Sequence, residues 1–285
     1  SYYDDQFLLR TGLIDARTYL KLVSKTVNQV HATPGRHEYS VAQASFDAWT
    51  RYYRPDENTA NATVSYYTKG ALVAMALDLS LRQLPTPASR EPASLDGVML
   101  RLWQLGRSID EDDIAQALEA EAGQPPTVAG VWSWKHLLAE WVHGTGDLPL
   151  SGLLEGMGVR WHAKAGSPSQ RLGMRVAESG GNLKVQAVMR HSAAEQAGLS
   201  AGDELLALDG WRLRRVDDIA TWWNDQQAQT LTVCRDQQLM PLILPALAKQ
   251  GAGDQPGAAS EQVLLTLQDS PSPESAKRRQ HWLLS

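Results

Sequence analysis

Apolar residues recur every three to four positions through the first 157 residues, which is the spacing of helices with one buried side. The clearest case begins after Asp15, a residue type that caps helices, and its apolar side consists of Tyr19, Leu20, Leu22, Val23 and Val27. The same spacing predicts further helices over residues 45–53, 66–84, 95–106, 110–122 and 134–143. We therefore expect residues 1–157 to form a helical domain.

The pattern changes after residue 157. Short apolar and β-branched runs lie between Gly-rich or polar turns, which predicts strands over residues 172–176, 183–188, 204–208 and 231–235. One helix is expected from Val216 to about Asn224, so residues 158–247 should form a small β-rich domain. Residues 248–285 predict a linker, a possible strand at 263–267 and a C-terminal helical tail. The expected fold is therefore a multidomain α and β fold.

The most specific pattern in the chain runs from His191 to Gly210. Gly198 and Gly202 suit positions where the backbone needs a positive φ, and Asp209-Gly210 is typical of a tight hairpin turn. This ordered run resembles the core of a bacterial-type PDZ domain. The resemblance implies a module that binds peptides or peptide C-termini.

In a PDZ domain the peptide adds as an extra strand beside the sheet, while its end meets free backbone N–H groups. The resemblance assigns peptide contacts to the loop and strand residues Leu172, Gly173, Met174 and Val176 and to the helix residues Ile219, Trp222 and Trp223. Only Gly173 is retained from the usual carboxylate-binding loop. Alternatively, the two Trp side chains fill the groove, and the domain only braces its neighbour.

Charge and composition exclude several classes of function. A net charge of −5 and a pI of about 5.8 argue against nucleic acid or an anionic membrane as the partner. No apolar run approaches the roughly 20 residues of a membrane span. Cys234 is the only cysteine, so an intrachain disulfide is impossible and a Cys-based metal site is disfavoured. The ten Trp residues are expected mostly in cores and domain seams.

Histidines offer no complete metal site. Residues 37–41 begin like a zinc-binding His-Glu-x-x-His motif, but Val41 stands where the second His is needed one helical turn later. His136, Glu140 and His143 can share one helix face, although two His seven residues apart converge poorly on one ion. We interpret them as an exposed face. Read alone, the sequence contains no complete catalytic constellation.

Four segments together indicate a family. They are the N-terminal Ser-Tyr-Tyr-Asp-Asp, the helix segment 64–79 with Tyr67-Thr-Lys-Gly, Trp141-Val-His-Gly-Thr-Gly-Asp-Leu-Pro, and Arg278-Arg-Gln-His-Trp-Leu. With the PDZ pattern between the last two, this order resembles the glycyl aminopeptidases of the gluzincin class. The resemblance implies the helical remainder of a thermolysin-like catalytic domain followed by a PDZ domain. It also implies release of N-terminal Gly or Ala by metal-activated water, with zinc as the cofactor of the parent enzyme.

The same resemblance determines which site residues can be carried over. It places the His-Glu-x-x-His helix and the third ligand, a Glu, before Ser1, so we expect no metal ligand, no zinc and no activity in this chain without the missing N-terminal part of the catalytic domain. It assigns to Tyr67, with Tyr66 as the fallback, the phenol that donates to the developing oxyanion. Asp4 and Asp5 are candidates to orient a zinc-binding His from behind, or they belong to a solvated helix face.

A second interpretation stays open from the sequence, namely a non-catalytic scaffold of helices and a PDZ domain that binds peptides. The motifs indicate a bacterial protein, and we expect a cytoplasmic location with the periplasm as the alternative. The expected partners are peptides, whether as substrates or as ligands of the PDZ groove.

Overall fold

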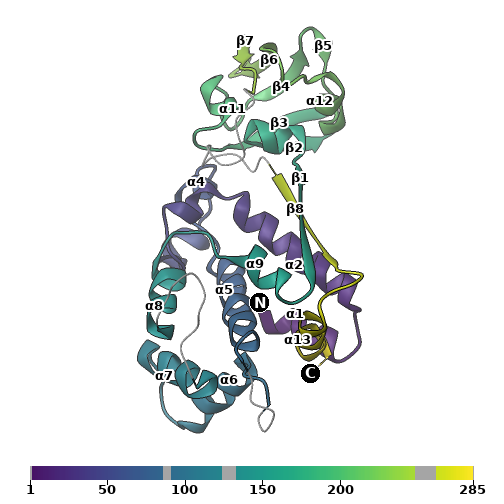
Figure 1. Ribbon diagram of the computed structural model, residues 1–285. Coiled ribbons are helices and arrows are strands. Elements are labelled where there is room, and N and C mark those ends of the chain that lie inside the picture. Colours follow the sequence, from purple (N-terminus) through teal and green to yellow (C-terminus); the bar gives the residue numbers. More distant parts are fainter. Residues whose placement is uncertain (1, 86–90, 124–132, 248–260, 285) are drawn as a thin grey trace.

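The computed structural model describes residues 2–85, 91–123, 133–247 and 261–284. Figure 1 shows a larger helical part and a smaller β-rich part at one end of it. This arrangement confirms the predicted combination of a helical region with a small β-rich domain. No helix in the described residues is long and apolar enough to cross a membrane.

The helical part contains most of the chain's helices. They are α1 (Tyr2–Arg10), α2 (Ala16–His31), η1 (Pro34–His37), α3 (Val41–Phe46), η2 (Ala48–Tyr52), α4 (Thr59–Ala62), α5 (Tyr66–Arg82), α6 (Leu95–Gln104), α7 (Glu111–Ala122), α8 (Trp134–Leu138), η4 (Ala139–His143) and α9 (Leu150–Glu155). Their starts follow local chemistry: the Asp15 side chain accepts the Thr18 N–H at 2.7 Å, and Ser65 accepts the Thr68 N–H at 3.4 Å.

The segment predicted as one helix over residues 45–53 is divided. Regular α3 ends at Phe46, and after Asp47 the chain continues as the π-helical turn η2. The Tyr53 N–H donates to the Ala48 carbonyl at 3.0 Å, five residues back, so the backbone is wound more widely there. This wider turn changes the directions of the following aromatic side chains relative to a regular helix.

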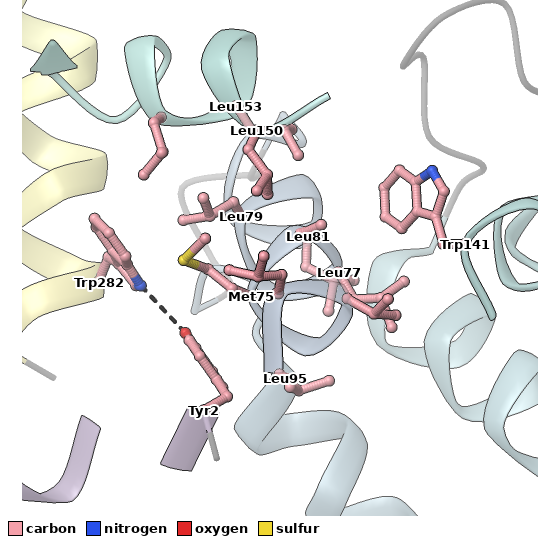
Figure 2. Close-up of a cluster of buried hydrophobic side chains, with 14 of the residues drawn as sticks. Tyr2, Met75, Leu77, Leu79, Leu81, Leu95, Trp141, Leu150, Leu153 and Trp282 are labelled. Carbon is pink, nitrogen blue, oxygen red and sulfur yellow. Dashed lines mark hydrogen bonds between the residues drawn. The ribbon is translucent and has the colours of Figure 1, made fainter. Parts of the chain in front are cut away.

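Helix α5 lies at the centre of the helical core. Met75, Leu79 and Leu81 are buried on it, and Figure 2 shows them between the aromatic rings of Tyr2 and Trp282 on one side and Trp141 on another. The indole N–H of Trp282 donates to the Tyr2 hydroxyl at 3.2 Å. The first and last described helices therefore close the core together.

A buried carboxylate organises the polar contacts in this core. Asp78 accepts hydrogen bonds from the Tyr2 hydroxyl at 2.6 Å, the Arg82 Nε at 2.8 Å and the Leu95 N–H at 2.7 Å. Burial raises the pKa of Tyr2 well above its ordinary value, with the charge of Asp78 as the second cause. The phenol therefore stays protonated and donates to Asp78.

Two strands connect the helical part to the β-rich part. β1 (Val159–Ala165) leads out of the helices, and β8 (Glu261–Leu267) leads back and pairs with it antiparallel. The two strands run side by side in Figure 1. Val159, Val263 and Leu265 belong to the helical core. The chain then ends in α13 (Pro273–Leu284), whose Trp282 is fully buried. The expected strand and helix after residue 260 thus complete the helical part, while the expected linker, 248–260, lies outside the described residues.

The β-rich part is an antiparallel sheet with the order β2-β3-β4-β6-β7, and β5 pairs with β4. Its elements are α10 (Pro168–Leu172), β2 (Met174–Ser179), β3 (Asn182–Val188), α11 (Ala193–Gln196), β4 (Glu204–Leu208), β5 (Trp211–Arg212), α12 (Val216–Trp222), β6 (Gln229–Arg235) and β7 (Gln238–Leu244). Asp209 and Gly210 have positive φ and form the turn between β4 and β5. A separate apolar cluster packs this part.

Asn61 in α4 joins the two parts. Its buried side-chain amide donates from Nδ2 to the Val188 carbonyl and accepts at Oδ1 from the Arg190 N–H, both at 2.8 Å. Ala60, Ala187 and Met189 bury a small apolar contact beside it, and Arg190 lies 3.3 Å from the Glu38 carboxylate. The end of β3 is therefore held directly on the helical part.

Candidate functional site

The start of α5 and the neighbouring η2 bring several phenols together on the surface of the helical part. We call Tyr52, Tyr53, Tyr66 and Tyr67 the tyrosine cluster. The Tyr66 and Tyr67 ring centroids are 4.3 Å apart, and the Tyr52 ring meets them at 5.3 and 5.7 Å. The Tyr53 hydroxyl oxygen lies 3.3 Å from that of Tyr67 and 3.5 Å from that of Tyr66. The hydroxyl groups of Tyr66 and Tyr67 are thus linked through the hydroxyl group of Tyr53.

The cluster is accessible to a ligand. Tyr67 is 49% exposed and Tyr53 50% exposed, and the neighbouring Trp49, whose ring is 5.1 Å from that of Tyr53, is 79% exposed. Large aromatic side chains that stay exposed on a folded domain are unusual when they lie together. The cluster is therefore the strongest candidate for a functional surface on the helical part.

The phenols differ in their acidity. The hydrogen bond from Tyr53, followed by that from Tyr66, lowers the pKa of Tyr67. The hydrogen bonds to Tyr53 and then Tyr67 raise the pKa of Tyr66. These opposite shifts fit an arrangement in which the Tyr67 oxygen accepts hydrogen bonds from its neighbours. Its own proton is then free for an external, negatively charged oxygen.

Tyr67 and Tyr66 were identified from the sequence, whereas Tyr53 and Tyr52 were missed as site residues. Residues 46–53 contain four aromatic side chains, and their helical spacing favoured a buried helix face. The structure instead exposes Phe46, Trp49 and Tyr53. The density of aromatic residues just before the Tyr-Tyr pair was the available signal.

Asp4 and Asp5 lie in the first turn of α1, whose buried residues are Tyr2, Gln6 and Leu9. Asp4 is exposed, and partial burial raises the pKa of Asp5. Helix α1 meets α5 at Asp78, eleven residues from Tyr67, a distance of about 16 Å along a helix. Their expected role behind a zinc-binding His stays a prediction.

The histidines considered from the sequence have carboxylate neighbours one at a time. His143 Nε2 is 2.7 Å from Glu111, His136 Nε2 is 3.9 Å from Glu140, and His37 Nε2 is 3.8 Å from Asp147. Within the described ranges, no group of three or more His, Cys, Asp or Glu residues is placed to hold a metal ion. The residues that the structure describes therefore do not fit a zinc site.

The β-rich part has a free sheet edge beside the loop expected to bind a carboxylate. β2 is the terminal strand of the sheet and pairs only with β3 among the described strands. Gly173 has a φ of 75° and ends α10 directly before β2. Leu172 and Met174 are buried in the core, and the Gly173 N–H donates to the Gln170 carbonyl at 3.0 Å, so these two side chains and this N–H are already engaged within the domain. A peptide strand can add at this edge.

The helix residues expected in the groove have specific neighbours. Ile219 is buried in the core, and Trp222 stacks on Trp211 of β5 with centroids 4.3 Å apart. The Arg171 guanidinium lies over the Trp223 ring at 4.8 Å and forms an ion pair with Asp225. Val176 packs against the core from β2. Each Trp therefore has a partner within the domain, and the assigned peptide contacts stay predictions.

Comparisons with known proteins match two stretches of the chain. The family model of the M61 glycyl aminopeptidases matches residues 1–73, and the PDZ domain model matches residues 160–242. The structure is also similar to the crystal structure of an aminopeptidase N family protein from Idiomarina loihiensis, with 28% sequence identity and a TM-score of 0.79. The resemblance to a PDZ-containing M61 peptidase is confirmed. The M61 match includes the whole tyrosine cluster.

The likeness to the Idiomarina loihiensis protein covers 100% of this chain and 47% of that one. This chain therefore spans about half the length of that structure. Other similar structures are an HtrA-type protease with a decapeptide (18% identity, TM-score 0.25, 44% of this chain and 37% of that one) and a photosystem II D1 C-terminal processing protease (14%, 0.25, 62% and 43%). No curated protein matches the chain.

Proposed function

We propose that this chain is part of a longer zinc-dependent aminopeptidase that releases N-terminal Gly or Ala, with a PDZ module that binds peptides. The observation that carries the proposal is the tyrosine cluster, exposed at the start of α5 within the region that matches the M61 glycyl aminopeptidases. By that resemblance the zinc ligands lie outside these residues. The chain's own contribution to the reaction is then a hydrogen-bond donor.

The role of Tyr67 follows from where charge develops during peptide hydrolysis. Attack on the scissile carbonyl places negative charge on its oxygen, and a donor already aimed at that position stabilises the transition state more than the substrate. Tyr67 is suited to this task in the arrangement where its oxygen accepts from the Tyr53 hydroxyl, 3.3 Å away, because its own O–H is then free. The lowered pKa of Tyr67 agrees with this direction. One such donor contributes roughly 10²- to 10³-fold in rate.

The test is Tyr67→Phe in the longer protein that contains this chain, with the p-nitroanilides of glycine and alanine as substrates. The change removes one hydroxyl and keeps the ring, so kcat and kcat/KM should fall together, on the order of 10²-fold, with KM nearly constant. Tyr66→Phe tests the fallback assignment, and Tyr52→Phe is the matched control, since Tyr52 meets Tyr67 through its ring at 5.7 Å. Full activity of Tyr67→Phe would refute the assigned role.

Measurements on the 285-residue chain and on the longer protein together distinguish the two interpretations of the whole molecule. We expect it to hold no stoichiometric zinc by metal analysis and to cleave neither substrate. One tightly held zinc per chain would show that residues such as His136 or His143 form a site. If the longer protein also lacks peptidase activity with zinc supplied, yet binds peptides, the scaffold interpretation is correct.

A further inference from the structure

The hydroxyl of Tyr53 has no role in the assignment above, yet it is the group that contacts both phenols at the start of α5. We infer that Tyr53 is a positioning residue for Tyr67: its hydroxyl holds the Tyr67 oxygen as a hydrogen-bond acceptor and directs the Tyr67 proton outward. This inference rests on the proposed function, because the outward proton matters only if Tyr67 meets a substrate oxygen.

Tyr53 is held in place by its backbone and by two neighbouring rings. The Tyr53 N–H closes the π-helical turn on the Ala48 carbonyl at 3.0 Å. Its ring is held edge-on by Tyr52 at 5.2 Å and from another side by Trp49 at 5.1 Å. In a regular helix the ring would point elsewhere, so the widened turn supplies this geometry. Single π-helical turns are frequent at functional sites.

The three phenols Tyr66, Tyr53 and Tyr67 have three hydroxyl protons to share. A phenol has one O–H to donate and can accept at its oxygen. The Tyr53 oxygen is 3.3 Å from the Tyr67 oxygen and 3.5 Å from the Tyr66 oxygen, so it can donate to one and accept from the other. The chain Tyr66 to Tyr53 to Tyr67 uses two protons internally and leaves the third, on Tyr67, for a ligand. The lowered pKa of Tyr67 and the raised pKa of Tyr66 agree with this direction.

The charged side chains of the α3–η2 segment are Asp47 and Arg51. Asp47 accepts a hydrogen bond from the Tyr39 hydroxyl and lies 3.8 Å from Arg51, whose guanidinium covers the Tyr39 ring at 4.9 Å. These two charged groups of the α3–η2 segment are thus engaged with Tyr39. The pKa of Tyr67 is lowered first by the hydrogen bond with Tyr53, which directly follows η2, and then by that with Tyr66 of α5, while burial opposes them as the last cause. The acidity of Tyr67 therefore depends on its phenol neighbours.

The experiment measures the Tyr67 phenol directly in the 285-residue chain. Tyrosine labelled with ¹³C at Cζ reports ionisation by NMR, and Tyr67→Phe identifies the Tyr67 signal. Tyr53→Phe should raise the pKa of Tyr67 toward the ordinary value of about 10. Tyr52→Phe is the control, since Tyr52 contacts the cluster through its ring, and it should leave the Tyr67 titration unchanged. An unchanged Tyr67 titration in a folded Tyr53→Phe chain would overturn the inference.

Kinetics of the longer protein separate this inference from the proposed function. Tyr53→Phe should lower kcat about tenfold with KM nearly constant, as expected for the loss of one supporting hydrogen bond. The double variant with Tyr67→Phe should be no slower than Tyr67→Phe alone, because Tyr53 acts through Tyr67. If Tyr67→Phe is impaired while Tyr53→Phe is fully active, only the inference fails. If Tyr67→Phe is fully active, the proposed function fails whatever the titration shows.

Discussion

Asp78 shows how a single residue can organise a core. Its carboxylate is almost without contact with water, and it receives donors from α1, α5 and the start of α6. The sequence displays this residue as an interruption in an apolar run, which by itself predicts only a polar position. Its partners Tyr2 and Leu95 are 76 and 17 residues away in the chain. No local pattern could have paired them.

We predict that Asp78→Asn destabilises the protein by about 3 kcal/mol, because it leaves the Arg82 charge buried without its carboxylate. Arg82 keeps the His281 carbonyl at 2.9 Å and a longer contact of 3.5 Å to Asp96, which limits the loss. Urea unfolding followed by circular dichroism measures the change. Asp112→Asn, which removes an exposed ion pair with Lys135, is the control and should change little.

Protonation of His31 should make the free energy of unfolding depend on pH. Burial lowers its pKa below the ordinary value, and Arg36 and His37 add to this effect while Asp147 opposes it. The unfolded chain therefore binds the proton more readily, and stability should fall as pH drops below about 6.5 until the folded pKa is passed. His37 shifts in the same direction.

The pH prediction is tested by urea unfolding at pH 7.5 and pH 5. His31→Gln should reduce the difference in unfolding free energy between the two pH values. His136→Gln, at an exposed position on α8, should leave the difference as it is. A pH dependence that is equal in the wild-type and His31→Gln chains would contradict the assignment to His31.

At the scale of elements, periodicity predicted the regular helices and failed at the irregular one. Helices α2, α6 and α7 follow the expected spacing because one side of each is buried, whereas α5 is buried on all sides from Met75 to Arg82. Over residues 45–53 the same spacing was present, but a π-helical turn follows Asp47, and Phe46, Trp49 and Tyr53 are exposed. Trp103 on α6 is 80% exposed, so hydrophobic side chains were also poor guides to burial outside the core. Burial depends on tertiary contacts, which local patterns do not contain.

Side chains of helix α2 supply hydrogen-bond partners for backbone groups of β8. The Asn28 amide accepts the Val263 N–H at 2.7 Å and donates to the Val263 carbonyl at 2.9 Å, and the Ser24 hydroxyl accepts the Leu265 N–H at 3.0 Å. Asn28→Ala should cost about 1–3 kcal/mol, because it leaves two backbone groups of β8 without partners. Hydrogen exchange of residues 261–267 should become faster, whereas the exposed Gln29→Ala should have no such effect.

At the scale of the whole molecule, the sequence predicted two parts but not how they meet. The PDZ pattern and the helical spacing are local, whereas the contact depends on Asn61 reaching the backbone at Val188 and Arg190. Asn61 is in a polar segment that is typical of a surface loop. The same reason applies to the candidate site. Tyr66 and Tyr67 could be predicted from a sequence motif, whereas the contact of Tyr53 with them is visible only in the folded structure.

We predict that Asn61→Ala loosens the PDZ domain from the helical part. The change leaves the Val188 carbonyl and the Arg190 N–H without their partner, at a cost of about 1–3 kcal/mol. Hydrogen exchange should become faster at residues 186–190 while the centre of the sheet stays protected. Asn58→Ala is the control, since Asn58 contacts the Asn61 side chain at 3.1 Å but does not reach the PDZ domain. Equal exchange in both variants would refute a locking role for Asn61.

The pairing of β1 with β8 has a consequence for how such a molecule can be assembled and taken apart. Ala165 and Glu261 face each other in the register, so the chain leaves and re-enters the helical part at adjacent points. The entire PDZ domain therefore occupies the position of a hairpin loop, the kind of site where whole domains are gained or lost without disturbing the host. Replacing residues 166–260 with an Asn-Gly turn should convert β1 and β8 into an ordinary hairpin. The shortened chain should still bury Trp282 against Tyr2, and the peptidase-like part would then be free of its insert.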